Sequence, residues 1–97
     1  MSKRKIIDTI FKNRALLTKY KVKAFALFGS YARKEQKKSS DVDFLVEFSE
    51  PTFRNYIGLL GDLRALLKSR VDLVCKDGLK PRIRSYILKD AEWLKKG

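Results

Sequence analysis

The stretch GSYARKEQKKSSDVDF, residues 29–44, decides how this chain folds because it joins two predicted strands. The apolar run over residues 22–28 is typical of a strand that is covered on both faces. Apolar and polar residues alternate over residues 41–48, which predicts a second strand. Gly29-Ser30 ends the first strand, whereas Asp41-Val42-Asp43 begins the second. These groups can form one site only if the two strands run antiparallel.

A third short strand is predicted from Val71 to Cys75, with Asp72 near its beginning. If Asp72 joins the same site, this strand must run parallel to the second, with the long helix between them as a crossover. Apolar spacing and end signals predict helices over residues 3–20, 31–36, 52–69 and from Pro81 onward. The predicted fold is α/β (α+β) in the order α-β-α-β-α-β-α, a three-stranded mixed sheet packed with helices.

Length and composition predict a single domain over residues 1–97. Hydrophobic residues make up 44% of the chain, which is enough for a core. No apolar run approaches the ~20 residues that span a bilayer, and charges such as Asp8 interrupt the basic start, unlike in a secretory signal. The single cysteine, Cys75, allows no internal disulfide. We therefore expect a cytoplasmic protein without a membrane segment, in which Cys75 is a buried thiol.

The chain contains no histidine. This excludes catalytic triads that use histidine, and with one cysteine it disfavours a structural zinc site. A metal would be held by oxygen ligands, which favours Mg²⁺ or Mn²⁺. The formal net charge of +12 attracts polyanions such as a triphosphate, a nucleic acid or an acidic protein surface. For most single lysines a solvated position is the simpler interpretation, and the pairs at 37–38 and 95–96 are too short for a nucleic-acid patch.

Two carboxylates are expected on one face of the second strand. Asp41 and Asp43 are two residues apart, so their Cα atoms lie about 6.6 Å apart and their side chains point the same way. Such groups repel each other unless a cation lies beside them, and Asp72 would add a third negative charge. Two metal ions about 4 Å apart could bridge a triphosphate there and activate a hydroxyl group. The three aspartates are therefore the candidate catalytic and metal-binding residues.

The Gly29-Ser30 turn is the candidate phosphate site. Gly29 lets the backbone approach a ligand, Ser30 is a suitable helix N-cap, and N–H groups at a helix start attract phosphates. Arg33 and Lys34 follow one turn later and add positive charge. Taken singly, the motifs fit an ordinary turn, a solvated strand end and a strand-edge carboxylate. Their combination with the predicted strands favours a functional site.

Segments 29–33, 40–46 and 71–74 resemble the signature of the DNA polymerase beta-like nucleotidyltransferases. The small size and the predicted closing helix over 83–94 are similar to the minimal nucleotidyltransferases, which are often antitoxin partners of HEPN-domain toxins. The resemblance implies roles for two sets of residues. The metals would be held by Asp41, Asp43 and Asp72, and the nucleotide would be bound by Gly29, Ser30 and Arg33.

The resemblance also implies an activity. A hydroxyl group attacks the α-phosphate of ATP and pyrophosphate leaves, with Asp72 drawing the proton from that hydroxyl. In the HEPN systems the acceptor is a tyrosine of the toxin, which becomes adenylylated. One position departs from the family pattern, because Gly commonly follows the Arg and Lys34 stands there instead. This substitution predicts a longer helix or an extra charge in the phosphate pocket.

Two other functions are compatible with the sequence. The chain could mask a toxin by binding alone, or it could transfer nucleotides to a small molecule or a nucleic acid, which the charge of +12 favours. Larger transferases add a second domain, so we expect a second copy or a partner protein to complete the site. On the last helix, Tyr86 and Leu88 are expected in the core, and Trp93 is a candidate for the partner contact. The acceptor, the nucleotide preference and the oligomeric state stay open.

Overall fold

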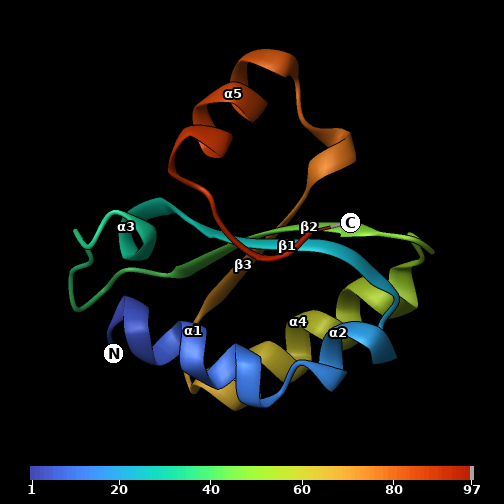
Figure 1. The fold of residues 1–97 in the computed structure, drawn as a ribbon, viewed down its shortest axis with the longest axis horizontal. Helices are drawn as coiled ribbons and strands as arrows, with labels where there is room; N and C mark the ends of the chain where they lie inside the picture. Colours follow the sequence, from blue (N-terminus) through green and yellow to red (C-terminus); the bar gives the residue numbers. More distant parts are fainter. Residues whose placement is uncertain (97) are drawn as a thin grey trace.

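The computed structural model describes residues 1–96, and its centre is a sheet with the strand order β3-β2-β1-β4 (Figure 1). β1 (Val22–Phe28) runs antiparallel to β2 (Val42–Phe48). β2 runs parallel to β3 (Val71–Cys75). Both strand directions confirm the prediction from the polar residues at the strand ends, and the mixed α+β class is confirmed as well.

The prediction of three strands is wrong, because a fourth strand, β4 (Glu92–Lys95), pairs antiparallel with β1. The last helix, α5 (Pro81–Asp90), ends before Ala91, whose backbone is extended. Residues that we expected in the closing helix therefore belong to the sheet. Without β4, backbone N–H and C=O groups along the edge of β1 would lack hydrogen-bond partners.

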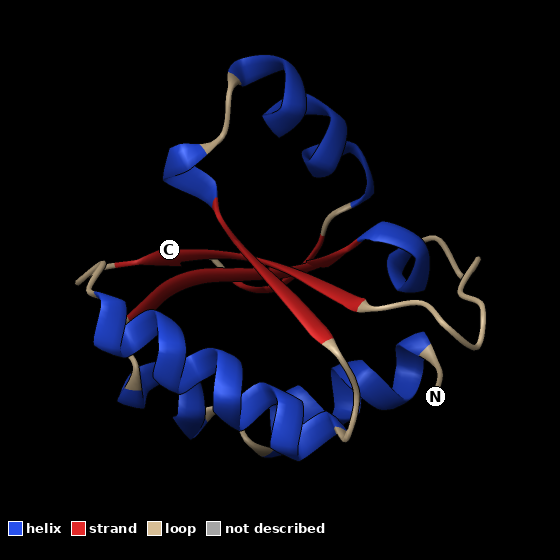
Figure 2. Cartoon of the chain, turned by 180° about the vertical axis from the view of Figure 1, so that it is seen from behind, coloured by secondary structure: helices blue, strands red, loops and turns tan. Residues whose placement is uncertain are grey.

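The helices form two unequal layers on the sheet (Figures 1 and 2). One face is covered by α1 (Lys3–Lys12), α2 (Ala15–Lys19) and α4 (Phe53–Leu67), and the other by α5. The main core lies under the three-helix layer, and its fully buried side chains include Ile6, Phe25, Phe44, Leu59 and Leu63. A smaller core under α5 contains Ala26, Leu45 and Ile87.

The predicted helix over residues 3–20 is interrupted. α1 ends at Lys12, where Asn13 folds back onto the helix: its Nδ2 donates to the carbonyl of Thr9, and its backbone N–H donates to that of Ile10. Asparagine favours such local hydrogen bonds over a continued helix. Two short elements, α3 (Gly29–Ala32) and the 3₁₀ helix η1 (Lys76–Gly78), complete the description.

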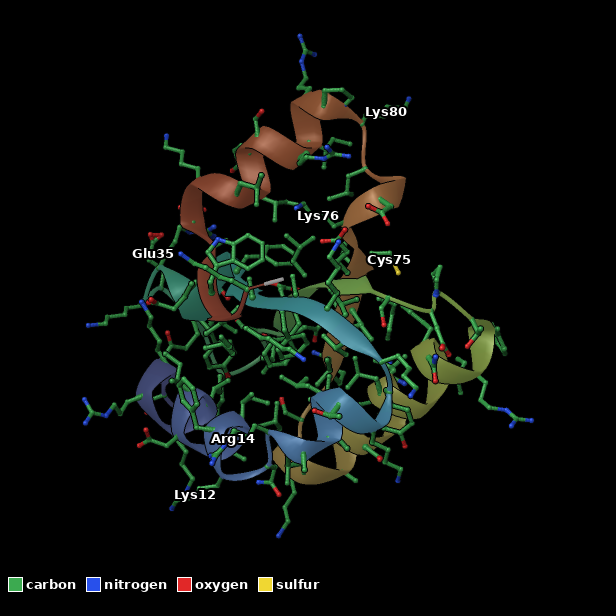
Figure 3. All side chains as sticks on the ribbon, turned by 45° about the vertical axis from the view of Figure 1, so that its right-hand side comes forward. Lys12, Arg14, Glu35, Cys75, Lys76 and Lys80 are labelled. Carbon is green, nitrogen blue, oxygen red and sulfur yellow. The ribbon has the colours of Figure 1, made fainter. Side chains whose placement is uncertain are left out.

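Two predictions of burial are wrong. Tyr86 is 72% exposed on the outer side of α5, and Cys75 is exposed where the edge strand β3 ends (Figure 3). Leu88 does pack against the small core, as predicted, and Trp93 packs there too. Within residues 1–96, no helix combines the length and the apolar character needed to cross a membrane.

Candidate active site

The strand register brings the predicted site residues to one end of the sheet. Asp43 of β2 lies opposite Phe28, the last residue of β1, and also opposite Asp72 of β3. Gly29 follows Phe28 directly, so the turn and the two carboxylates are neighbours across three adjacent strands. Asp43 shares a face of β2 with Leu45, and Leu45 belongs to the core under α5. The site therefore lies on the α5 side of the sheet.

Gly29 meets two requirements that only glycine satisfies well. Its φ is +78°, a left-handed conformation that strains residues with a Cβ atom. A Cβ atom at this position would also collide with Oδ2 of Asp43. The backbone of the turn thus lies directly against the carboxylate, and a phosphate held at the turn would lie beside Asp43.

The short helix α3 differs from its prediction in two ways. It begins at Gly29, with Phe28 at the N-cap position, so Ser30 lies inside the first turn and does not cap it. It also ends at Ala32 and does not reach residue 36, and Lys34 beyond it has a left-handed backbone with φ +59°. Glycine adopts that conformation most easily. Lys34 therefore adopts a backbone conformation that glycine would adopt with less strain, and the predicted longer helix is wrong.

Arg33 lies beside the phosphate turn but is engaged by acidic side chains. Its Nη1 donates to Oδ2 of Asp90 at 2.9 Å, and its Nε donates to Oε1 of Glu35 at 3.4 Å. The charge of Arg33 also acts on Asp43, where it lowers the pKa. Sequence reasoning missed Asp90 because it is 57 residues away from Arg33 and no local pattern links the two.

Asp43 is a half-buried carboxyl group with a raised pKa. Burial is the main cause, followed by the negative charge of Asp72, a hydrogen bond shared with Asp72 and the charge of Asp41. Together they raise the pKa of Asp43 from its ordinary value of 3.8 to about 6. Acidic groups placed so close together are the kind of cluster that a divalent cation stabilises.

Asp41 acts on Asp43 through its charge, but its own carboxylate pairs with Arg70. Its Oδ1 lies 3.0 Å from Nε of Arg70, another contact that the sequence did not indicate. In the described part of the chain, no three Asp, Glu, His or Cys side chains are arranged to hold one cation together. The donor set still fits Mg²⁺, because it consists of carboxylate oxygens, two of whose side chains, Asp43 and Asp72, lie opposite each other on neighbouring strands.

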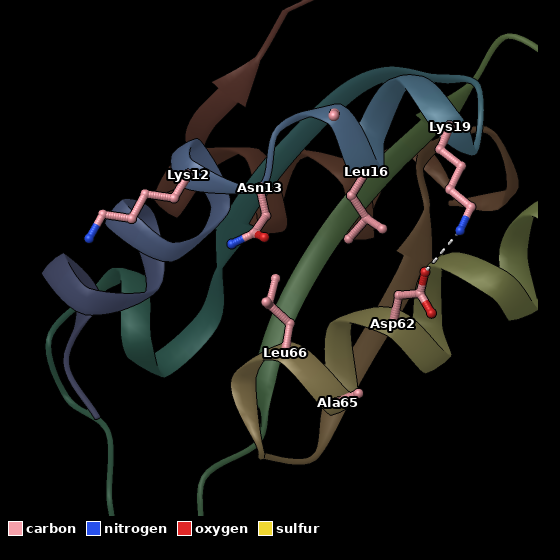
Figure 4. Close-up of a pocket in the computed structure, with 8 residues that line it drawn as sticks. Lys12, Asn13, Leu16, Lys19, Asp62, Ala65 and Leu66 are labelled. Carbon is pink, nitrogen blue, oxygen red and sulfur yellow. Dashed lines mark ion pairs between the residues drawn. The ribbon is translucent and has the colours of Figure 1, made fainter.

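A pocket of about 460 Å³ opens beside Asp43 and Asp72, between β3, α4 and α5. Most of its lining is apolar, including Phe28, Leu60, Val74, Leu79, Ile83 and Ile87. A larger pocket of about 720 Å³ lies between α2, the end of α1 and α4 (Figure 4). That pocket contains none of the predicted site residues, so we assign the active site to the smaller one.

Comparisons with known proteins agree with this geometry. Residues 12–94 match the family described as nucleotidyltransferase domain. The protein adenylyltransferase MntA of Thermococcus cleftensis is 42% identical over 82 residues, which cover 84% of this chain and 83% of the relative. A solved structure, provisionally described as a minimal nucleotidyltransferase, superposes with a TM-score of 0.84 at 33% identity and covers 95% of both chains.

A more distant solved structure shares the fold of the chain. It is a tri-AMPylated HEPN toxin of Shewanella oneidensis in complex with an MNT antitoxin. The superposition has a TM-score of 0.69 at 22% identity, and it covers 98% of this chain and 73% of that chain.

Proposed function

The chain belongs to the nucleotidyltransferase domain family and is a nucleotidyltransferase, and we propose that it is an antitoxin that transfers AMP from ATP to a tyrosine of a HEPN-type toxin. The observation that carries this proposal is the turn at Gly29, packed against Asp43, with Asp72 on the next strand. A relative named as a protein adenylyltransferase and a toxin–antitoxin complex of the same fold support a protein acceptor.

In this proposal, one set of residues binds the phosphates of ATP and another residue accepts the proton of the acceptor hydroxyl. The Gly29-Ser30 turn receives the β- and γ-phosphates, because its backbone approaches the site without a side chain in between, and the charge of Arg33 adds attraction. Asp72 is exposed beside the pocket and takes the proton of the acceptor hydroxyl. Mg²⁺, or Mn²⁺, held by the aspartates would supply positive charge to the phosphate oxygens.

The transfer makes one bond and breaks one. The acceptor oxygen bonds to the α-phosphorus of ATP, and the bond from that phosphorus to the oxygen bridging to the β-phosphate breaks. Pyrophosphate leaves with the electron pair of the broken bond. Because Asp43 carries a raised pKa, its deprotonation near neutral pH prepares the site for the cation.

An adenylylation assay tests the proposal. The chain is incubated with ATP, Mg²⁺ and a HEPN-type toxin, and the mass of that toxin should rise by one or more AMP groups. Asp43→Asn should slow the transfer at least about 100-fold, because losing a metal ligand costs more than losing an outer hydrogen-bond partner. Glu47→Gln, on the same face of β2, is the control. A toxin without added mass, while ATP binds normally, would exclude the activity.

Masking without catalysis is a second candidate, and one observation favours it. Asp41 faces Arg70, and the described residues contain no closed set of three metal-binding side chains. Under this alternative the chain neutralises the toxin by covering it. A folded Asp41→Asn/Asp43→Asn variant that still neutralises the toxin would support masking, whereas loss of neutralisation by that variant would support catalysis.

A further inference from the structure

The pocket of about 720 Å³ between α2, the end of α1 and α4 is not used by the proposed function. Leu16 of α2 and Leu66 of α4 point toward each other across it (Figure 4). Leu66 also lines a smaller pocket of about 270 Å³, together with Lys5 and Thr9 of α1. The two pockets therefore adjoin each other at Leu66, and together they form what we call the α1–α4 groove.

Apart from the lysines, the polar side chains of the groove make hydrogen bonds within the chain. Oγ1 of Thr9 donates to the carbonyl of Lys5 at 2.7 Å, and Nδ2 of Asn13 donates to that of Thr9 at 2.8 Å. Asp62 accepts a hydrogen bond from the hydroxyl of Tyr20 at 2.6 Å. A sugar or a nucleoside needs several hydrogen-bond partners, whereas leucine and alanine side chains offer surface that apolar groups can cover. The groove is therefore suited to apolar side chains.

One wall of the groove is positively charged. Lys5 and Lys12 are about two helical turns apart on α1, so they lie on nearly the same side of it, and Lys19 follows on α2. Lys19 pairs with Asp62 at 3.8 Å, and among residues 1–96 Asp62 is the only acidic side chain that lines either pocket.

The charge of this wall favours one kind of occupant. In the described part of the chain, neither Lys5 nor Lys12 forms an ion pair. A second copy of the chain would bring its own net charge of +12 to these lysines, which opposes self-association. A partner with acidic side chains would instead be attracted to them.

We propose that the α1–α4 groove binds an acidic amphipathic helix of a partner protein. The apolar stripe of that helix, with one side chain at every third or fourth residue, covers Leu16 and Leu66, and its acidic side chains lie beside Lys5 and Lys12. The groove belongs to the helix layer opposite α5 (Figure 1), so a docked helix leaves the active site open. This inference goes beyond the proposed function and does not depend on it.

Fluorescence anisotropy with a labelled peptide tests the groove. The probe is a peptide of about 18 residues, long enough to form a helix, with a leucine at every third or fourth position and glutamates on either side of this stripe. The control peptide has the same composition in a scrambled order, so it keeps the charge and loses the stripe. We expect saturable binding of the probe and binding of the scrambled peptide that is at least about tenfold weaker.

Two pairs of variants locate the binding. Leu66→Ala should weaken it about fivefold, because apolar surface is removed; Ile57→Ala, at a position on α4 that is 46% exposed and lines neither pocket, should not. Lys5→Glu/Lys12→Glu should weaken it about tenfold and should strengthen binding of a peptide with lysines in place of the glutamates. Lys80→Glu/Lys89→Glu removes the same charge from exposed positions at α5 and is the control.

Four results would overturn the proposal. They are the absence of saturable binding, equal binding of the probe and the scrambled peptide, equal weakening by a variant and its control, and displacement of the probe by ATP, which would place it in the active site. Sedimentation velocity adds a fifth, because a dimer that Leu66→Ala dissociates would assign the groove to a second copy. Binding of the probe by a chain that transfers no AMP would overturn the proposed function and leave this inference standing.

Discussion

At the scale of single residues, Asp43 makes the ligand-free protein less stable. In the unfolded chain this carboxyl group loses its proton near pH 3.8, whereas in the folded protein it does so near pH 6. Between these values the folded state binds more protons than the unfolded state does. The free energy of unfolding therefore falls as the pH rises from about 4 to about 6, and it stays low at higher pH. Before its cation binds, a cation site made of carboxylates is expected to lower the stability of the fold in this way.

We predict that Asp43→Asn stabilises the ligand-free protein at pH 7. The full pKa shift would correspond to about 3 kcal/mol, but Asp43 is only half buried, so solvent screening reduces the expected gain to about 1 kcal/mol. The fall in stability between about pH 4 and 6 should also be lost. Urea unfolding at both pH values measures this. Glu47→Gln removes a group that pairs with Lys76 at 3.8 Å and should give no gain; a less stable Asp43→Asn would contradict the prediction.

Lys34 gives a second prediction at this scale. A left-handed backbone costs a residue with a Cβ atom about 1–2 kcal/mol, and glycine loses part of that advantage through its freedom in the unfolded chain. Lys34→Gly should therefore stabilise the protein by about 0.5–1 kcal/mol. Lys34→Ala removes the charge but keeps the Cβ atom, so equal stabilisation by both variants would assign the effect to charge. Thermal unfolding is the measurement.

At the scale of elements, the edge strand β3 is protected by α4. The hydroxyl of Tyr56 donates to the carbonyl of Leu73, and Arg64 donates to that of Val71. Such carbonyl groups could otherwise pair with a strand of another molecule. The two side chains thus occupy two carbonyl groups of β3 and anchor α4 to this strand, beside the active-site pocket.

Tyr56→Phe tests this protection. Loss of the hydrogen bond should lower the free energy of unfolding by about 1 kcal/mol and leave the carbonyl of Leu73 open to other strands. Urea unfolding and sedimentation velocity measure the two effects. Tyr86→Phe is the control, because Tyr86 is 72% exposed and its hydroxyl group should contribute little. An unchanged stability of Tyr56→Phe would show that water replaces the bond without cost.

At the scale of the whole molecule, the larger core and the pair Asp43 and Asp72 lie on opposite faces of the sheet. The main core lies under α1, α2 and α4, whereas α5 covers a smaller core and leaves room for the site. The ion pair between Arg33 and Asp90 joins α3 to the end of α5 at 2.9 Å. α5 therefore spans the site, with Ile83 beside the pocket and Asp90 beside the phosphate turn.

Much of this arrangement could be predicted without coordinates. Apolar runs located β1 and β3, and alternation of apolar and polar residues located β2. The polar residues at the strand ends specified the strand directions, because side chains can share a site only at one end of a sheet. The same reasoning brought Gly29 together with Asp43 and Asp72, and the register confirms it. These predictions are confirmed because each combines a local sequence pattern with a general rule of strand geometry.

Other features depended on contacts between distant segments. Residues 92–95 have a pattern that suits a helix, yet they form a strand because β1 offers an open edge. Arg33 and Asp41 were assigned to ligands, but their observed partners are Asp90 and Arg70. The periodicity of a segment indicates which of its side chains are buried. It does not indicate which groups of other segments those side chains contact. The tertiary structure alone decides such pairs, because hydrogen-bond and charge partners are chosen by proximity in space.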